Sequence, residues 1–216
     1  MEKEFKNKKI EAKRELSQEE KETLASFKTI LQPWPWGNQK DKIDLLLVWR
    51  GLKSATQINL DPKISDTDLK KMEEVIKNAG LFFKDSGITQ DPQKYGSNAG
   101  RVCFVANNQE DLDLIFKNRK LSTLEAASEM GRMSGFPKSA IENFIQFNKN
   151  NDNNDANSQK NFYLTDEERE INIPKKLNKI ASFKLSRKNW KEELETARRW
   201  AKEIKFIAPE LYENLY

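Results

Sequence analysis

The chain has 216 residues, enough for one large domain or for one domain with a small helical appendage. Cys103 is its only cysteine and it has no histidine, which excludes an intramolecular disulfide, the usual zinc sites, and Ser-His-Asp or Cys-His catalysis. Any catalysis would depend on Asp, Glu, Lys, Tyr, Ser or an added cofactor. We expect no structural metal and no cofactor.

The charge balance disfavours, but does not exclude, a nucleic-acid partner. Basic residues exceed acidic ones by only four, and no run of five or six like charges occurs. A protein partner or a small anionic ligand is the expected class. The first residues contain no apolar stretch of signal-peptide length, and the apolar run 45–49 is too short to span a bilayer. We therefore expect a cytoplasmic protein without membrane contact.

Residues 1–16 form a charged tail, and residues 17–147 are expected to form an α+β core. A capping box at 17–20 and apolar positions at helical spacing predict a helix over 18–31. The apolar run 43–49 has the length of a buried strand, with a short buried helix as the alternative. Further strands are expected at 55–60, 81–83 and 101–106, and a helix at 67–79 after Ser65 or Asp66.

The second half of the chain reads as helical. We expect helices after Asn107 or Asn108 and after a capping box at 122–125, followed by another beyond the break at 135–137. Residues 148–161 hold seven asparagines and no large apolar side chain, which predicts a disordered loop. Residues 162–216 are expected to pack on the core as a helical segment, with Ser186 capping its main helix. The fold class is therefore α+β, with a small mixed sheet of three or four strands flanked by helices.

Residues 131–144 resemble the signature of an uncharacterised prokaryotic domain family, Gly-Arg-x-x-Gly-Tyr-Pro-x-Cys-Cys-x-x-x-Phe. In outline the similarity extends over residues 120–216. Ser139 and Ala140 occupy the positions of the paired cysteines. The resemblance implies a shared scaffold, and any metal or redox role of the cysteine pair would be absent from this chain.

Three polar residues each follow a predicted strand, namely Asp61, Asp85 and Asn107. In a parallel sheet they would gather at one edge, where a carboxylate pair and an amide can bind a cation or a polar substrate. An antiparallel hairpin would scatter them. The ordinary interpretation is that Asp61 begins an Asp-Pro turn and that Asn107 caps a helix.

Other candidates are predicted to bind ligands. Arg50, Lys53 and Arg101 flank strand ends and could receive an anion, and Trp34 and Trp36 could form an aromatic platform. The corner 131–137 could present backbone amides to an anion, or it is simply a tight turn between two helices. Its candidate residues are Gly131, Arg132, Gly135, Phe136 and Pro137.

Two function classes remain. The first, which we favour because no phosphate-binding or nucleophile motif is recognisable, is a non-catalytic binding or regulatory module. The second is a carboxylate-dependent enzyme, with or without Mg²⁺, that acts on a phosphorylated or polar small substrate.

Overall fold

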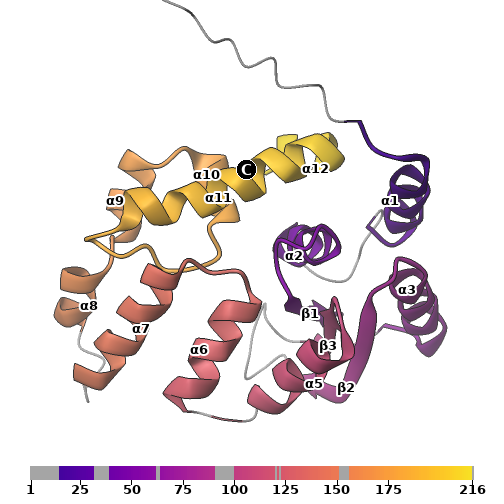
Figure 1. Ribbon diagram of the computed structural model, residues 1–216, viewed down its shortest axis with the longest axis horizontal. Helices are drawn as coiled ribbons and strands as arrows, with labels where there is room; N and C mark the ends of the chain where they lie inside the picture. The colour runs from indigo at the N-terminus through magenta and orange to yellow at the C-terminus, as the bar shows by residue number, and fades with distance from the viewer. Residues whose placement is uncertain are drawn as a thin grey trace, which may run out of the picture.

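The computed structural model describes residues 15–31, 39–61, 64–90, 100–119, 121, 123–150 and 156–215. Figure 1 shows α11 crossing the molecule, with α6 and α7 on one side of it and the sheet beside them. The elements in chain order are α1 Gln18–Leu31, α2 Gln39–Trp49, β1 Ala55–Leu60, α3 Asp66–Asn78, β2 Phe82–Gln90, β3 Gly100–Ala106, α5 Gln109–Asn118, α6 Leu124–Met133, α7 Lys138–Asn150, α8 Ala156–Phe162, α9 Asp166–Asn172, α10 Lys175–Ile180, α11 Trp190–Ile207 and α12 Pro209–Glu213.

The strands form one sheet in the order β1-β3-β2, and both pairings are antiparallel. This confirms the α+β class, and it selects the antiparallel hairpin that the sequence left open. The physical reason is the connection between β2 and β3, residues 91–99. A crossover that returns a parallel strand needs a dozen residues or more, so this connection can only reverse the chain.

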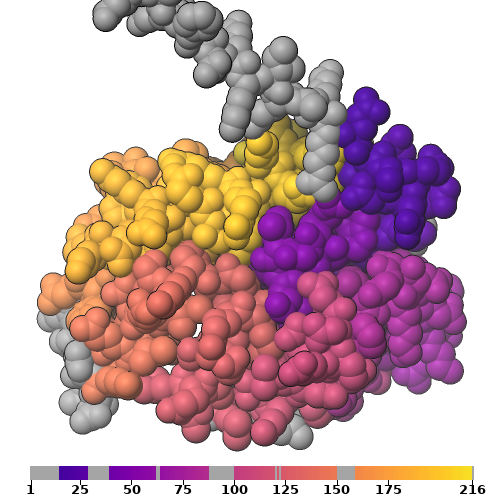
Figure 2. Space-filling model, viewed as in Figure 1, coloured from indigo at the N-terminus to yellow at the C-terminus, as the bar shows by residue number. Residues whose placement is uncertain are grey.

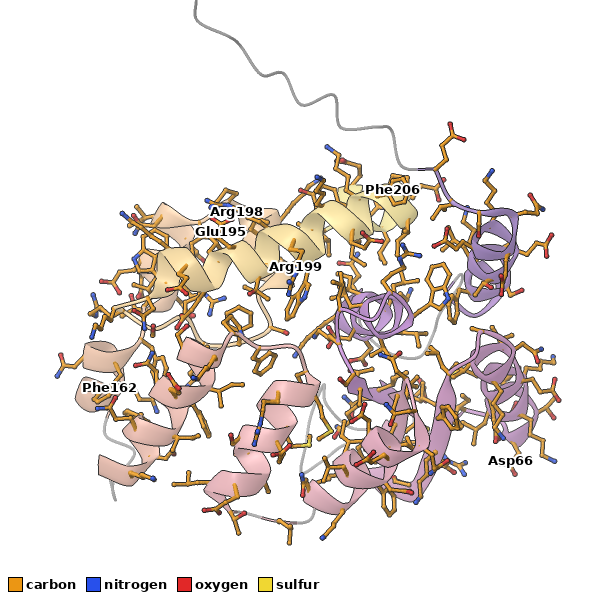
Figure 3. The ribbon with its side chains drawn as sticks, in the orientation of Figure 1. Asp66, Phe162, Glu195, Arg198, Arg199 and Phe206 are labelled. Atoms are coloured by element: carbon orange, nitrogen blue, oxygen red, sulfur yellow. The ribbon has the colours of Figure 1, made fainter. Side chains whose placement is uncertain are left out.

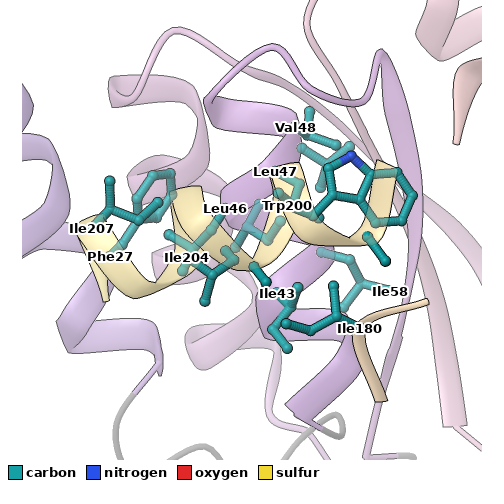
Figure 4. Packing of buried hydrophobic residues seen from close by; sticks show 14 of the residues in the cluster. Phe27, Ile43, Leu46, Leu47, Val48, Ile58, Ile180, Trp200, Ile204 and Ile207 are labelled. Carbon is teal, nitrogen blue, oxygen red and sulfur yellow. The ribbon is translucent and has the colours of Figure 1, made fainter. Parts of the chain in front are cut away.

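Helices cover both faces of the sheet. Because successive side chains of a strand point to opposite sides, β3 contributes to a hydrophobic cluster on each face. Val102 and Phe104 of β3 pack with Leu112 and Ile115 of α5 in a small cluster. Cys103 and Val105 face the larger cluster, which also contains Trp200 of α11. Figure 4 shows the centre of this larger cluster, where Trp200 and Ile204 lie against Leu46 and Leu47 of α2.

The apolar run at 43–49 belongs to a helix, α2, so the strand expected there is wrong. Ile43, Leu45, Leu46, Leu47 and Val48 are all buried, because β1, α10 and α11 surround this helix. A helix enclosed on all sides lacks the polar face that produces a 3.6-residue period. Its sequence therefore resembles a buried strand.

Several predicted helix starts are confirmed, and two need correction. Ser17 and Glu20 form the expected capping box, and Ser65 caps α3. The caps of the later helices are Asn108 for α5, Thr123 for α6 and Asn189 for α11. Asn108 is one of the two caps expected for α5, whereas Thr123 and Asn189 lie one and three residues beyond the expected caps Ser122 and Ser186. Ser122 itself lies outside the described residues. The Thr123 side chain accepts the Ala126 N–H, whereas Asn189 makes no side-chain cap hydrogen bond and donates its own N–H to the Ser186 hydroxyl.

The Asn-rich segment is partly helical, contrary to the disordered loop expected for 148–161. Helix α7 continues to Asn150, where Asn148 donates its side-chain amide to the carbonyl oxygen of Phe144. Helix α8 begins at Ala156 and is anchored at its end, where the ring of Phe162 lies 5.3 Å from that of Phe147. Aromatic contacts just outside the polar stretch thus order its flanks.

None of the helices in the described ranges has both the length and the apolarity that crossing a bilayer demands.

Candidate functional site

The corner between α6 and α7 is closely packed, as the structural reading of this motif predicts. Gly135 has φ of +68°, and a Cβ atom there would lie 2.5 Å from the carbonyl oxygen of Leu52. Gly131 lies against Ile141, whose Cγ1 would be 3.0 Å from an added Cβ. The two glycines therefore allow α6 to turn sharply against α7 and against the core.

This corner forms one wall of a groove of about 430 Å³. Figure 2 shows the molecular surface hollowed between α6 and α7. The opposite wall is the chain around Tyr163 and the segment 182–184. The lining is predominantly apolar: Ala127, Met130, Gly131, Ser134, Phe136, Ala140, Ile141, Phe144, Tyr163, Ser182, Phe183 and Lys184. Its size and composition match those of small-molecule sites.

Tyr163 lines this groove and is held in place by backbone contacts. An isolated antiparallel bridge pairs it with Ser186, and the backbone N–H of Leu164 donates to the carbonyl oxygen of Leu185 at 3.0 Å. The side chain is 5% exposed, and its hydroxyl is buried without a hydrogen-bond partner among the described residues. Burial, followed by the nearby negative charge of Glu193, raises the pKa of Tyr163 to about 12. The hydroxyl therefore stays protonated at neutral pH and remains a hydrogen-bond donor without an acceptor in the described structure.

Behind the groove lies a buried ion pair. Lys53 is 3% exposed, and its Nζ is 2.6 Å from Oδ1 of Asp44. The ammonium also lies 4.4 Å from the centre of the Trp200 ring and donates to Oγ of Ser182 at 3.4 Å. Burial lowers the pKa of Lys53, and the charge and hydrogen bond of Asp44 oppose that effect. The pair thus holds Ser182, a lining residue, from the core side.

The rim adds an exposed cation. Lys184 lines the groove, and its Nζ lies 5.2 Å from the centre of the Tyr163 ring and 3.3 Å from Oε1 of Gln159. Together with Ser134 and Ser182, this ammonium offers hydrogen-bond donors around an apolar floor. Among the described lining residues none is acidic. The arrangement suits a ligand with an apolar body and an acceptor at one end.

The polar residues that follow the strands do not converge, so the predicted edge site is wrong. Asp61 follows β1 at the end of the sheet where β3 begins, whereas Asn107 follows β3 at the opposite end. Asn107 donates its side-chain amide to the carbonyl oxygen of Lys53 at 2.8 Å, which is a structural contact. Asp85 lies within β2, opposite Cys103. Antiparallel pairing is the cause, because it places the carboxyl ends of two neighbouring strands at opposite ends of the sheet.

The candidate arginines are engaged in ion pairs. Arg50 joins α1 to α11 through Glu20 and through Glu203, the latter at 2.6 Å. Arg132 is exposed and pairs with Glu129 one helical turn away. Arg50 is thus a structural clamp between helices. Trp34 and Trp36 lie outside the described residues.

Two predicted site residues, Asp85 and Arg101, meet as an ion pair on β2 and β3. Nε of Arg101 lies 3.0 Å from Oδ2 of Asp85, and Asp66 approaches Nη1 at 3.4 Å. Partial burial alone would raise the pKa of Asp85, but hydrogen bonds from Arg101 and from the Gly87 N–H outweigh it and hold the pKa low. The ionised carboxylate of Asp85 therefore links β2 to β3 through its ion pair with Arg101.

The depressed pKa predicts an acid-dependent contribution to stability. Asp85 should stabilise the fold fully above its ordinary pKa of 3.8, and this contribution should disappear as pH falls through the lower folded value. The stability difference between wild type and Asp85→Asn, measured by urea unfolding from pH 6 to pH 2, should therefore shrink only below about pH 4. A difference independent of pH would contradict this assignment.

Tyr163, Ser182 and Lys184 were not predicted as site residues, because none belongs to a motif or a periodic pattern. No three His, Cys, Asp or Glu side chains within the described part of the chain are grouped so that they could hold a metal ion. Comparison with protein-family models, with curated protein sequences and with solved structures gave no match. The family resemblance of residues 131–144 therefore stays a prediction.

Proposed function

We propose that this chain is a non-catalytic binding module, and that the groove beside the α6–α7 corner takes a small ligand with an apolar body and an anionic end. The single observation that carries the proposal is that Tyr163 lines an apolar groove while its buried hydroxyl has no hydrogen-bond partner in the described structure. A buried donor without a partner costs about 1–3 kcal/mol. A ligand acceptor would recover that cost.

The position of Lys184 supports an anionic end rather than a neutral one. Its ammonium stands over the Tyr163 ring at the rim, so one carboxylate could accept hydrogen bonds from both side chains. Hydrogen bonds that involve a charged acceptor are shorter and about twice as strong as neutral ones. Phe136, Ile141 and Phe144 would then contact the apolar body.

The test compares octanoate with octanol by calorimetry and thermal shift. We expect octanoate to bind more tightly than octanol, and Tyr163→Phe to weaken octanoate binding about tenfold, as loss of a hydrogen bond to a charged group would. Without ligand, Tyr163→Phe should be as stable as wild type or more stable, by up to about 1 kcal/mol, because it removes an unpaired buried donor.

The matched controls are two alanine-to-tryptophan changes. Ala127→Trp should fill the groove and abolish binding, whereas Ala25→Trp on the exposed side of α1 should leave it unchanged. If neither compound stabilises the wild-type protein, or if Ala127→Trp binds octanoate normally, the groove is not a ligand site of this kind.

A further inference from the structure

The positive charge of the chain is concentrated in its C-terminal helices. Residues 173–216 carry eleven Lys and Arg against six Glu, a net charge of +5, whereas the entire chain has +4. The remaining 172 residues are thus almost neutral. The small net charge of the whole chain therefore does not reveal that residues 173–216 form a basic region.

Two of those six glutamates point into the protein. Glu193 is completely buried, where it accepts hydrogen bonds from the backbone N–H and the hydroxyl of Ser186. Glu203 lies 2.6 Å from Nε of Arg50 and has a side chain only 15% exposed. The outer surface of these helices is therefore more basic than their sequence suggests.

The outward basic residues border a groove of about 580 Å³ between α10, α11 and α12. Its lining contains five cations and one tyrosine, with apolar residues between them. The charged and aromatic residues are Lys175, Lys176, Arg198, Lys202, Lys205 and Tyr212. Figure 3 shows Arg198 on the side of α11 that faces away from α6 and α7. None of the described lining residues is acidic.

Glu195 and Glu213 reduce this charge only weakly. Glu195 pairs with Arg198 and Glu213 pairs with Lys176, and the two glutamate side chains are 63% and 61% exposed. Exposed pairs of this kind contribute little free energy, so a polyanion can displace them easily. The ammonium groups of Lys176 and Lys205 lie 4.9 Å and 5.8 Å from the centre of the Tyr212 ring. Cations and an aromatic face therefore occupy the same groove.

We infer that this groove binds single-stranded nucleic acid, independently of the ligand groove proposed above. Five cations contributed by α10 and α11 match a chain of several phosphates better than a single anion. A row of basic side chains with an aromatic ring beside it is the arrangement by which proteins track a single-stranded backbone and stack a base. Tyr212 would supply the stacking face, and the lysines would contact the phosphates.

The test measures binding of a fluorescein-labelled 20-nucleotide single-stranded RNA by anisotropy, at salt concentrations from 50 to 300 mM. We expect affinity to fall with salt, with a log–log slope of about −3 from the neutralised phosphates. The double variant Lys175→Glu/Lys205→Glu should weaken binding at least tenfold. Tyr212→Leu should weaken it about fivefold or more while changing the salt slope little.

The matched control is Lys70→Glu/Lys71→Glu on the exposed side of α3, which makes the same change of net charge elsewhere. It should leave affinity within twofold of wild type. The inference is overturned if the RNA does not bind at 50 mM salt, or if both double variants weaken binding equally. It is also overturned if poly-glutamate of matched charge, or a 20-base-pair duplex, binds as tightly as the single strand.

Discussion

Asp44→Ala should lower the free energy of unfolding by about 3–5 kcal/mol, a large part of the stability of a typical domain. The reason is the burial of Lys53, whose ammonium lies within the core against Trp200 and has Asp44 as its anionic partner at 2.6 Å. Removal of the carboxylate leaves a buried charge without compensation. Urea unfolding followed by circular dichroism measures the loss.

The double variant Lys53→Met/Asp44→Ala separates this cause from simple loss of packing. It should recover most of the stability, because replacing both partners of a buried pair by apolar groups is often neutral. The Asp44→Ala protein should also become more stable as pH rises towards 10.5, since the unfolded chain then binds more protons at Lys53 than the folded one. Additive losses in the double variant would show that the pair is not the source.

Glu193→Ala should destabilise the protein by a comparable amount, about 2–4 kcal/mol. Its carboxylate accepts the Ser186 backbone N–H at 2.6 Å and the Ser186 hydroxyl at 2.7 Å, and the residue is completely buried. Truncation leaves both donors unpaired within the core. The same circular dichroism measurement applies, and Glu192→Ala, one position earlier on the exposed face of α11, is the control and should change stability by less than about 0.5 kcal/mol.

Glu193→Ala should also affect the ligand groove, because Ser186 pairs with Tyr163 through the backbone bridge. Loosening of Ser186 should therefore weaken octanoate binding even though Glu193 does not line the groove. Equal stability of Glu193→Ala and Glu192→Ala would contradict the structural role of this carboxylate.

The sequence predicted most elements, and the failures have specific physical causes. Helices with one apolar face were found, because amphipathic periodicity carries the signal: α3 and α11 are examples. Helix α2 was mistaken for a strand because its neighbours cover it on every side. Strand direction was left open, and it alone decided whether Asp61 and Asn107 would meet.

The candidate site was predicted only in part. Gly131 and Phe136 were among the predicted binding residues and do line the groove, because glycine and proline mark a corner in any sequence. The opposite wall depends on a bridge between Tyr163 and Ser186 and on the burial of Glu193. These contacts involve residues distant along the chain from the corner, and no spacing in the sequence reveals them. Likewise, the basic groove could not be predicted, because residue spacing does not show that Glu193 and Glu203 point into the protein.

The position of Cys103 gives this protein a built-in reporter. It lies in β3, the central strand, with its side chain fully buried, and burial raises the pKa of its thiol. Because a thiol reacts as the thiolate and only where a reagent can reach it, alkylation requires a neighbouring strand or helix to part from β3. The labelling time of this one atom thus measures how often the sheet opens. In the variants described above, it shows whether a loss of stability reaches the central strand of the sheet.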